Sequence, residues 1–298
     1  MSKKKYAVMG ATGHIGRVVS EKLLAAGQEV RVLSRSEDRV KDLKAKGAAV
    51  VIGSLDDPAG LARAFEGADG LFLMIPPDMT GPDYRGFQKK VGEAIVAALK
   101  KTNVRHAVFL SSVGAHLSEK TGPILGLHDQ EERLNALADL NAVHLRPASF
   151  MENLLMLAAP VKTQGLLGSA LQAGLKIPMI ATRDIADRAA TLLLGLDFHG
   201  KTTQELLGER DVSMNEVAAL LGPAIGKPDL KYVQFPYEGV VAAMTGMGLP
   251  KPTADLMIEM YRSFNEGFLR PSETRSKRNT TPTTIEEFVK TVLAPACR

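Results

Sequence analysis

Short apolar runs alternate with amphipathic stretches through the first half of the chain. The apolar runs cover residues 5–10, 29–34, 48–53, 70–76, 106–112 and 141–147. Helical patterns between them cover residues 14–27, 37–46, 57–67, 83–101 and a segment that starts near Gly126. Near-continuous apolar strands between amphipathic helices are typical of a parallel sheet that is covered on both faces. The pattern therefore predicts an α/β fold, with a doubly wound parallel Rossmann sheet formed by residues 1–150.

The rhythm becomes irregular after Pro147, because prolines divide the chain into shorter elements. Helical patterns cover residues 183–195, 213–222, 254–268 and 284–294. No repeat, low-complexity stretch or linker interrupts this half. We expect residues 151–298 to form a smaller α/β substrate lobe over the carboxyl edge of the sheet, intertwined with the end of the Rossmann sheet, to which one strand can return.

A glycine-rich segment, GATGHIG at 10–16, joins the first predicted strand to the first predicted helix. Gly10 permits a tight turn, Gly13 lets the backbone approach a diphosphate, and Gly16 allows close packing of helix and strand. The free N–H groups and the dipole of the helix start favour phosphate. In this strand–turn–helix setting the segment predicts a dinucleotide site.

The end of the second predicted strand indicates which dinucleotide binds. NAD sites usually carry an acidic residue there, but this strand ends with Ser34 and Arg35, and the first carboxylate is Glu37. A guanidinium can hold a 2′-phosphate through charge-assisted hydrogen bonds, and Ser34 would add a hydroxyl. The pattern therefore favours NADP(H). By topology, other strand ends at the same edge put Gly53, Ser54 and Leu55 beside adenine, and Met74, Ile75 and Pro76 along the inner ribose.

Several segments, taken together and in order, resemble the NmrA-like group of atypical short-chain dehydrogenases. They include GATGHIG (10–16), VRHAVFLSSVGA (104–115), LRPASFMENLL (145–155) and TRDIADRAA (182–190). The resemblance implies a Rossmann domain with a small C-terminal substrate lobe and a preference for NADP(H). It spans NADPH-dependent reductases of quinones and dyes as well as non-catalytic redox-sensing regulators, so it does not decide activity.

The resemblance also implies roles for individual residues. It assigns the phosphates to Gly10, Thr12, Gly13, His14, Ile15 and Gly16, and the 2′-phosphate to Arg35. It assigns the nicotinamide half to Ile75, Pro76, Ser111, Ser112 and Val113, with Pro147 and Phe150 beside the ring. The substrate cleft is assigned to Phe150 and Asn153.

The proton donor of the main short-chain dehydrogenase branch, the tyrosine of a Tyr-x-x-x-Lys pair, is missing. The chain has five tyrosines, and none is followed by lysine four residues later. Ser111 and Ser112 stand at the end of the fifth predicted strand, with Ser112 the candidate for a catalytic serine. Reduction stays possible, because hydride can pass to a quinone, a dye or another conjugated acceptor whose product anion is protonated by water.

GLHDQEERL (126–134) occupies the place of that pair, and three interpretations of His128 compete. A metal site would need more histidines or cysteines, so we expect no metal. As a general acid, His128 suits neutral pH, since its ordinary pKa is about 6.5. As a structural residue, it packs against the loop at 115–125, while Glu131 and its acidic neighbours form a charged first helical turn.

An apolar lobe would suit a conjugated acceptor. Candidate lining residues are Phe150, Met151, Leu154, Met156, Phe235, Tyr237, Met244 and Met247. We expect His144 to be a core residue, and we expect Asp184 to cap a helix or to tether the lobe to the sheet. We assign no chemistry to the segment FNEGFLRP (264–271).

Composition narrows the class of protein and its partners. The chain has 45% apolar residues, a net charge of +4 and one cysteine, Cys297, which favours a cytoplasmic location. No signal peptide is expected, and the apolar runs are far shorter than the ~20 residues of a membrane span. Without tryptophan or interleaved aromatic and basic residues, nucleic-acid binding is not expected. The predicted partner is a small-molecule substrate; a homodimer stays open, and a partner protein belongs only to the regulator hypothesis.

Overall fold

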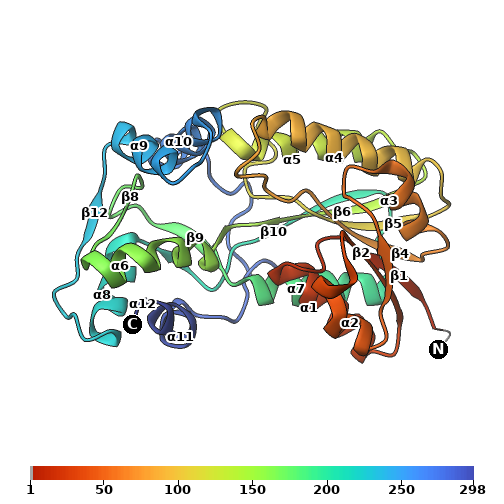
Figure 1. Ribbon diagram of the computed structural model, residues 1–298, viewed down its shortest axis with the longest axis horizontal. Coiled ribbons are helices and arrows are strands. Elements are labelled where there is room, and N and C mark those ends of the chain that lie inside the picture. The colour runs from red at the N-terminus through yellow and green to blue at the C-terminus, as the bar shows by residue number, and fades with distance from the viewer. Residues whose placement is uncertain (1–2) are drawn as a thin grey trace.

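A seven-stranded parallel sheet is the centre of the computed structural model, which describes residues 3–298 (Figure 1). Its strand order is β10-β6-β5-β4-β1-β2-β3, and every pairing in it is parallel. The strands are β1 (Lys5–Val8), β2 (Glu29–Ser34), β3 (Ala49–Ile52), β4 (Gly70–Met74), β5 (His106–Leu110), β6 (Asn141–Pro147) and β10 (Lys201–Leu206). The order reverses direction between β1 and β4, which opens a crevice at the carboxyl ends of these strands. The predicted doubly wound Rossmann sheet is confirmed.

Helices cover both faces of this sheet (Figure 1). One layer contains α1 (His14–Ala25), α2 (Lys41–Ala45) and α7 (Thr182–Gly195), and the other contains α3 (Pro58–Phe65), α4 (Tyr84–Leu99) and α5 (Leu125–Asn135). Val19 and Leu23 of α1 pack with Ile185 of α7 in one buried core, whereas Phe65 of α3 and Ile95 of α4 belong to the second core. The near-continuous apolar strands are thus explained, because both their faces are buried.

Local chemistry sets the ends of several elements. The Asp57 carboxylate accepts a hydrogen bond from the Ala59 N–H and so caps α3, where Pro58 takes the first helical position. The predicted helix over 37–46 begins instead as a 3₁₀ turn, Glu37–Val40, before α2. The first strand ends at Val8, earlier than predicted, and the chain then turns at Gly10 with a φ of +69°.

The second half of the chain builds a lobe beside the carboxyl edge of the sheet (Figure 1). Its strands are β7 (Ser149–Phe150), β8 (Leu167–Ser169), β9 (Ile177–Ile180), β11 (Asp211–Val212) and β12 (Tyr232–Gln234). Its helices are α6 (Ala158–Gln164), α8 (Met214–Ala224), α9 (Tyr237–Gly246), α10 (Lys251–Asn265), α11 (Ile285–Phe288) and α12 (Ala294–Cys297). α7 and β10 return to the large sheet, where β10 pairs with β6.

Buried carboxylates tie the C-terminal segment to this framework. Asp184, in the first turn of α7, accepts hydrogen bonds from the N–H and the hydroxyl of Thr283, at 3.0 and 2.7 Å. Glu205 of β10 accepts hydrogen bonds from the backbone N–H groups of Ser272 and Glu273. The tether expected of Asp184 is confirmed. Among residues 3–298, no helix has both the length and the apolar character needed to cross a membrane.

Candidate functional site

The glycine loop between β1 and α1 has the geometry of a phosphate cradle. The Gly13 N–H donates to the Gly10 carbonyl at 2.9 Å, which closes the turn. A Cβ atom on Gly16 would collide with the backbone of Gly10, so only glycine fits there. No side chain caps the start of α1 at Gly13, and the first N–H groups of a helix lack partners within it. They are therefore available to a bound anion.

A cavity of about 280 Å³ opens above this loop at the carboxyl ends of β1, β4 and β5. Its wall includes six predicted cofactor residues and the predicted substrate residue Asn153. The six are Gly10, Gly13, His14, Ile15, Gly16 and Phe150. Met74, which was expected along the inner ribose, also lines this cavity, as does Met156, which was expected in the lobe. Four further lining residues were not predicted from the sequence: Phe72, Leu110, Glu152 and Thr182. Glu152 is held by Thr182, whose N–H lies 3.0 Å from each carboxylate oxygen.

The end of β2 carries the residues predicted to select NADP(H). Arg35 is exposed, and its guanidinium has no hydrogen-bond or ion-pair partner within residues 3–298, so it is free to meet a ligand. Ser34 is buried, and its hydroxyl donates to the Ser36 carbonyl at 2.7 Å, so that proton is already used. Gly53 lies beside this strand end, with its N–H bonded to the Ser34 carbonyl.

The remaining predicted cofactor residues stand at strand ends or on the loop, without lining the 280 Å³ cavity. They are Thr12, Ser54, Leu55, Ile75, Pro76, Ser111, Ser112, Val113 and Pro147. Ser112 and Val113 line a second cavity instead.

That second, larger cavity, of about 430 Å³, lies between the sheet edge and the lobe. It shares Phe150 and Asn153 with the smaller cavity, so these two residues stand at the junction of both. Met260 and Phe264 of α10 form one wall, followed by Gly267, Leu269, Arg270 and Pro271. The segment 264–271, which was predicted to carry no chemistry, thus supplies much of this wall. The sequence carries only a weak indication of this wall, because the apolar spacing of α10 is equally typical of a core helix.

The expected apolar lining of the lobe is only partly correct. Of the eight candidate residues, Phe150 and Met156 line a cavity, while Met151 and Leu154 are buried in the lobe core. Phe235, Tyr237 and Met244 pack in a small separate cluster between α9 and α10, and Met247 is 74% exposed. Amphipathic spacing alone could not separate core positions from cavity positions.

A buried ion pair explains the acidic stretch of α5. Glu131 receives two hydrogen bonds from the Arg146 guanidinium, at 2.9 and 2.5 Å, and a third from the Ser111 hydroxyl. The helix begins at Leu125, so Glu131 lies in its second turn and faces inward. The prediction of a charged first turn was therefore wrong for Glu131. The Ser111 hydroxyl is committed to this pair, whereas Ser112 donates to the Val113 carbonyl on the cavity side.

His128 lies outside both of these cavities. Its Nδ1 donates to the Ala115 carbonyl at 2.9 Å, within a polar hollow shared with His116, Glu131 and Arg146. The contact with the 115–125 loop agrees with the structural interpretation. His144 is buried as expected, and burial lowers its pKa below the ordinary value. Within residues 3–298, no group of three His, Cys, Asp or Glu side chains is placed to hold a metal ion.

None of the tyrosine side chains, all within the described residues, lines either cavity. Burial raises the pKa of Tyr6 and of Tyr84 to about 12, and it raises the pKa of Tyr232 and of Tyr261. A catalytic tyrosine needs the opposite shift, so the cavities offer no activated phenol.

Strand order and glycine loop define an α/β protein of the Rossmann class. The profile of the NmrA-like family matches residues 2–289, and the chain belongs to that family. The family prediction made from the sequence motifs is confirmed.

Two of the relatives are named as reductases. The chain is 33% identical to an NAD(P)H azoreductase of Xenophilus azovorans over 85% of each protein. It is 30% identical to a (4-alkanoyl-5-oxo-2,5-dihydrofuran-3-yl)methyl phosphate reductase of Streptomyces griseus, over 85% of this chain and 84% of that protein. Among solved structures, an NADPH-dependent quinone oxidoreductase of Escherichia coli in complex with NADPH superimposes with a TM-score of 0.81. It is 26% identical and is matched over 95% of this chain and 98% of that chain.

Proposed function

We propose that the protein is an NADPH-dependent oxidoreductase that reduces a quinone-like, azo or other conjugated small molecule. The observation that carries the proposal is the junction of two cavities at Phe150 and Asn153, one above the glycine loop and one in the lobe. A cofactor in the first and an acceptor in the second would meet at this junction. The azoreductase and quinone reductase activities of its relatives support the same conclusion.

Main-chain N–H groups and a cationic side chain would bind the cofactor. The first-turn N–H groups of α1 would hold the diphosphate, and the exposed Arg35 guanidinium would hold the 2′-phosphate. The half-buried Phe150 would cover the nicotinamide ring and keep water from it. When bound, NADPH supplies a hydride to the acceptor.

Proton delivery would come from water rather than from a dedicated acid. The cavities carry no tyrosine, and His128 lies in a separate hollow. The chain's contribution is then position, since Phe150, Asn153 and Ser112 surround the space in which the acceptor lies. Acceptors that gain two electrons without a strong acid, such as quinones, fit this arrangement best.

The test is NADPH consumption by the purified protein against quinones, azo dyes, triphenylmethane dyes and enones. A matched pair, Gly13→Asp and Gly13→Asn, checks where the cofactor binds. Gly13 has the extended backbone of a helix N-cap, which both side chains suit, and a Cβ atom there meets only the Gly10 carbonyl at 3.4 Å. Only aspartate adds a negative charge beside the diphosphate. Its KM for NADPH should exceed that of the asparagine variant by roughly tenfold.

Absence of turnover with every acceptor, despite tight NADPH binding, would contradict the reductase proposal. The regulator hypothesis would then predict different affinities for NADP⁺ and NADPH, coupled to the binding of a partner protein.

A further inference from the structure

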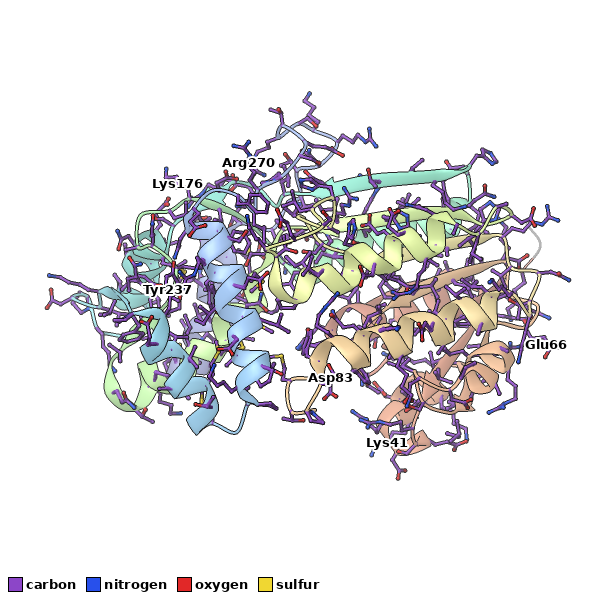
Figure 2. The ribbon with its side chains drawn as sticks, turned by 90° about the horizontal axis from the view of Figure 1, so that it is seen from above. Lys41, Glu66, Asp83, Lys176, Tyr237 and Arg270 are labelled. Atoms are coloured by element: carbon purple, nitrogen blue, oxygen red, sulfur yellow. The ribbon has the colours of Figure 1, made fainter. Side chains whose placement is uncertain are left out.

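Two cations stand on the wall of the larger cavity without a partner. Lys176, just before β9, and Arg270, after α10, both line this cavity. Both side chains are exposed, and neither has an ion-pair or hydrogen-bond partner within residues 3–298. Figure 2 shows them on the lobe, far from Lys41 and Glu66 at the other end of the molecule. Two positive charges brought together from distant segments favour a ligand with negative charge.

The one carboxylate on the same wall does not cancel this charge. Asp211 forms an ion pair with the Arg275 guanidinium. Arg275 also donates to the carbonyl groups of Leu207 and Gly208, which hold the guanidinium in place. The Lys176 and Arg270 charges therefore stay uncompensated.

Apolar groups form most of the remaining wall. Val113, Ile124, Leu175, Met260, Phe264 and Leu269 supply it from the sheet edge, from α10 and from the loops beside them. The junction with the smaller cavity lies at Phe150 and Asn153. A ligand that fits this wall has an apolar conjugated body toward the junction and an anionic group toward the two cations.

We propose that Lys176 and Arg270 form a specificity site for an anionic substituent, a carboxylate, sulfonate or phosphate, on the conjugated acceptor. This inference rests on the proposed reductase function and names its substrate class. Charge-assisted hydrogen bonds from Lys176 and Arg270 bind the substituent and orient the acceptor in the cavity. Neutral acceptors of the same shape enter with weaker affinity.

The experiment compares para-methyl red, which carries a carboxylate, with its neutral methyl ester. In the Lys176→Met/Arg270→Met double variant, the KM for the acid should rise about tenfold, since each exposed charge pair contributes modestly. The KM for the ester and for NADPH should stay within about twofold. Added salt should weaken binding of the acid to the native protein and leave the double variant little changed.

Lys101→Met is the matched control, because Lys101 is exposed and lies just after α4, away from both cavities. This variant should leave the KM values for both dyes unchanged. Equal losses for acid and ester, or no loss for either, would overturn the proposal.

Calorimetric binding of the acid to protein saturated with NADP⁺ separates this inference from the reductase function. Binding of the acid that weakens in the double variant, without reduction of either dye, would retain the anion site and contradict the reductase. Reduction of both dyes with identical kinetics in all variants would retain the reductase and contradict the anion site.

Discussion

In the proposed cofactor site, some residues act through their small size and another acts through its charge. The glycines of the loop would admit the diphosphate because they carry no side chain, whereas Arg35 offers a charge that has no partner within residues 3–298. Arg35→Gln should raise the KM for NADPH by about 10- to 100-fold, because a hydrogen bond to a charged group contributes roughly 1.5–3 kcal/mol. The KM for NADH should hardly change, since NADH lacks the 2′-phosphate. Steady-state kinetics with both coenzymes measure this difference.

Arg105→Gln is the control for this measurement. Arg105 is exposed and precedes β5, at the opposite edge of the sheet from the glycine loop. Its replacement should leave the KM values for NADPH and NADH unchanged. Equal losses of NADPH and NADH activity in Arg35→Gln would assign Arg35 to a role other than phosphate selection.

Residue patterns predict local sites better than sites assembled by tertiary folding. Gly10, Gly13 and Gly16 could be recognised because their spacing follows a strand and opens a helix. Lys176 and Arg270 could not, since they are far apart in the chain and only the lobe brings them to one cavity. Glu131 was misassigned for the same reason, because its partner Arg146 comes from another element.

At the scale of elements, the Glu131–Arg146 pair joins α5 to β6. Their side chains are 4% and 11% exposed, so removal of one charge leaves the other buried without compensation. Glu131→Gln should lower the free energy of unfolding by about 3 kcal/mol, measured by urea denaturation. The adjacent exposed Glu132→Gln should change it by less than about 0.5 kcal/mol.

A double variant distinguishes the pair from simple packing. Glu131→Met/Arg146→Met removes both charges, so it should be more stable than the sum of the two single changes predicts. Additive losses would mean that the two side chains act independently and that the buried pair does not join these elements energetically.

For the molecule as a whole, the alternating apolar pattern was enough to predict six of the seven strands of the sheet, because each of these six is a short apolar run. The seventh strand, β10, has the mainly polar sequence KTTQEL, so the pattern did not locate it. The lobe was harder to predict, since its two small sheets and its helices depend on contacts between distant segments. β10 returns to pair with β6, and Glu205 of β10 accepts hydrogen bonds from the backbone at 272–273. These contacts hold the lobe to the sheet. The cavities between them therefore depend on the stability of the whole chain.

The free energy of unfolding should decrease in two separate pH ranges as the pH is lowered. Burial lowers the pKa of His144, His106 and His116 below the ordinary 6.5. Below pH 6.5 the unfolded chain therefore binds protons that the folded chain does not, and the free energy of unfolding decreases as the pH falls. Hydrogen bonds lower the pKa of Asp56 and Glu216 below 3.8 and 4.5, so their contribution is present above these values and is lost at still lower pH.

His144→Gln tests the upper range. Glutamine can keep the hydrogen bond that His144 Nε2 makes with Asn135, at 2.8 Å, but it cannot take up a proton. Urea denaturation between pH 7.5 and about 5 should therefore give a shallower decline for the variant than for the native chain. His14→Gln, at an exposed position away from these three histidines in the sequence, should change the slope little. An equally steep decline in His144→Gln would assign the upper range to other groups, because a side chain without a titrating proton cannot contribute to it.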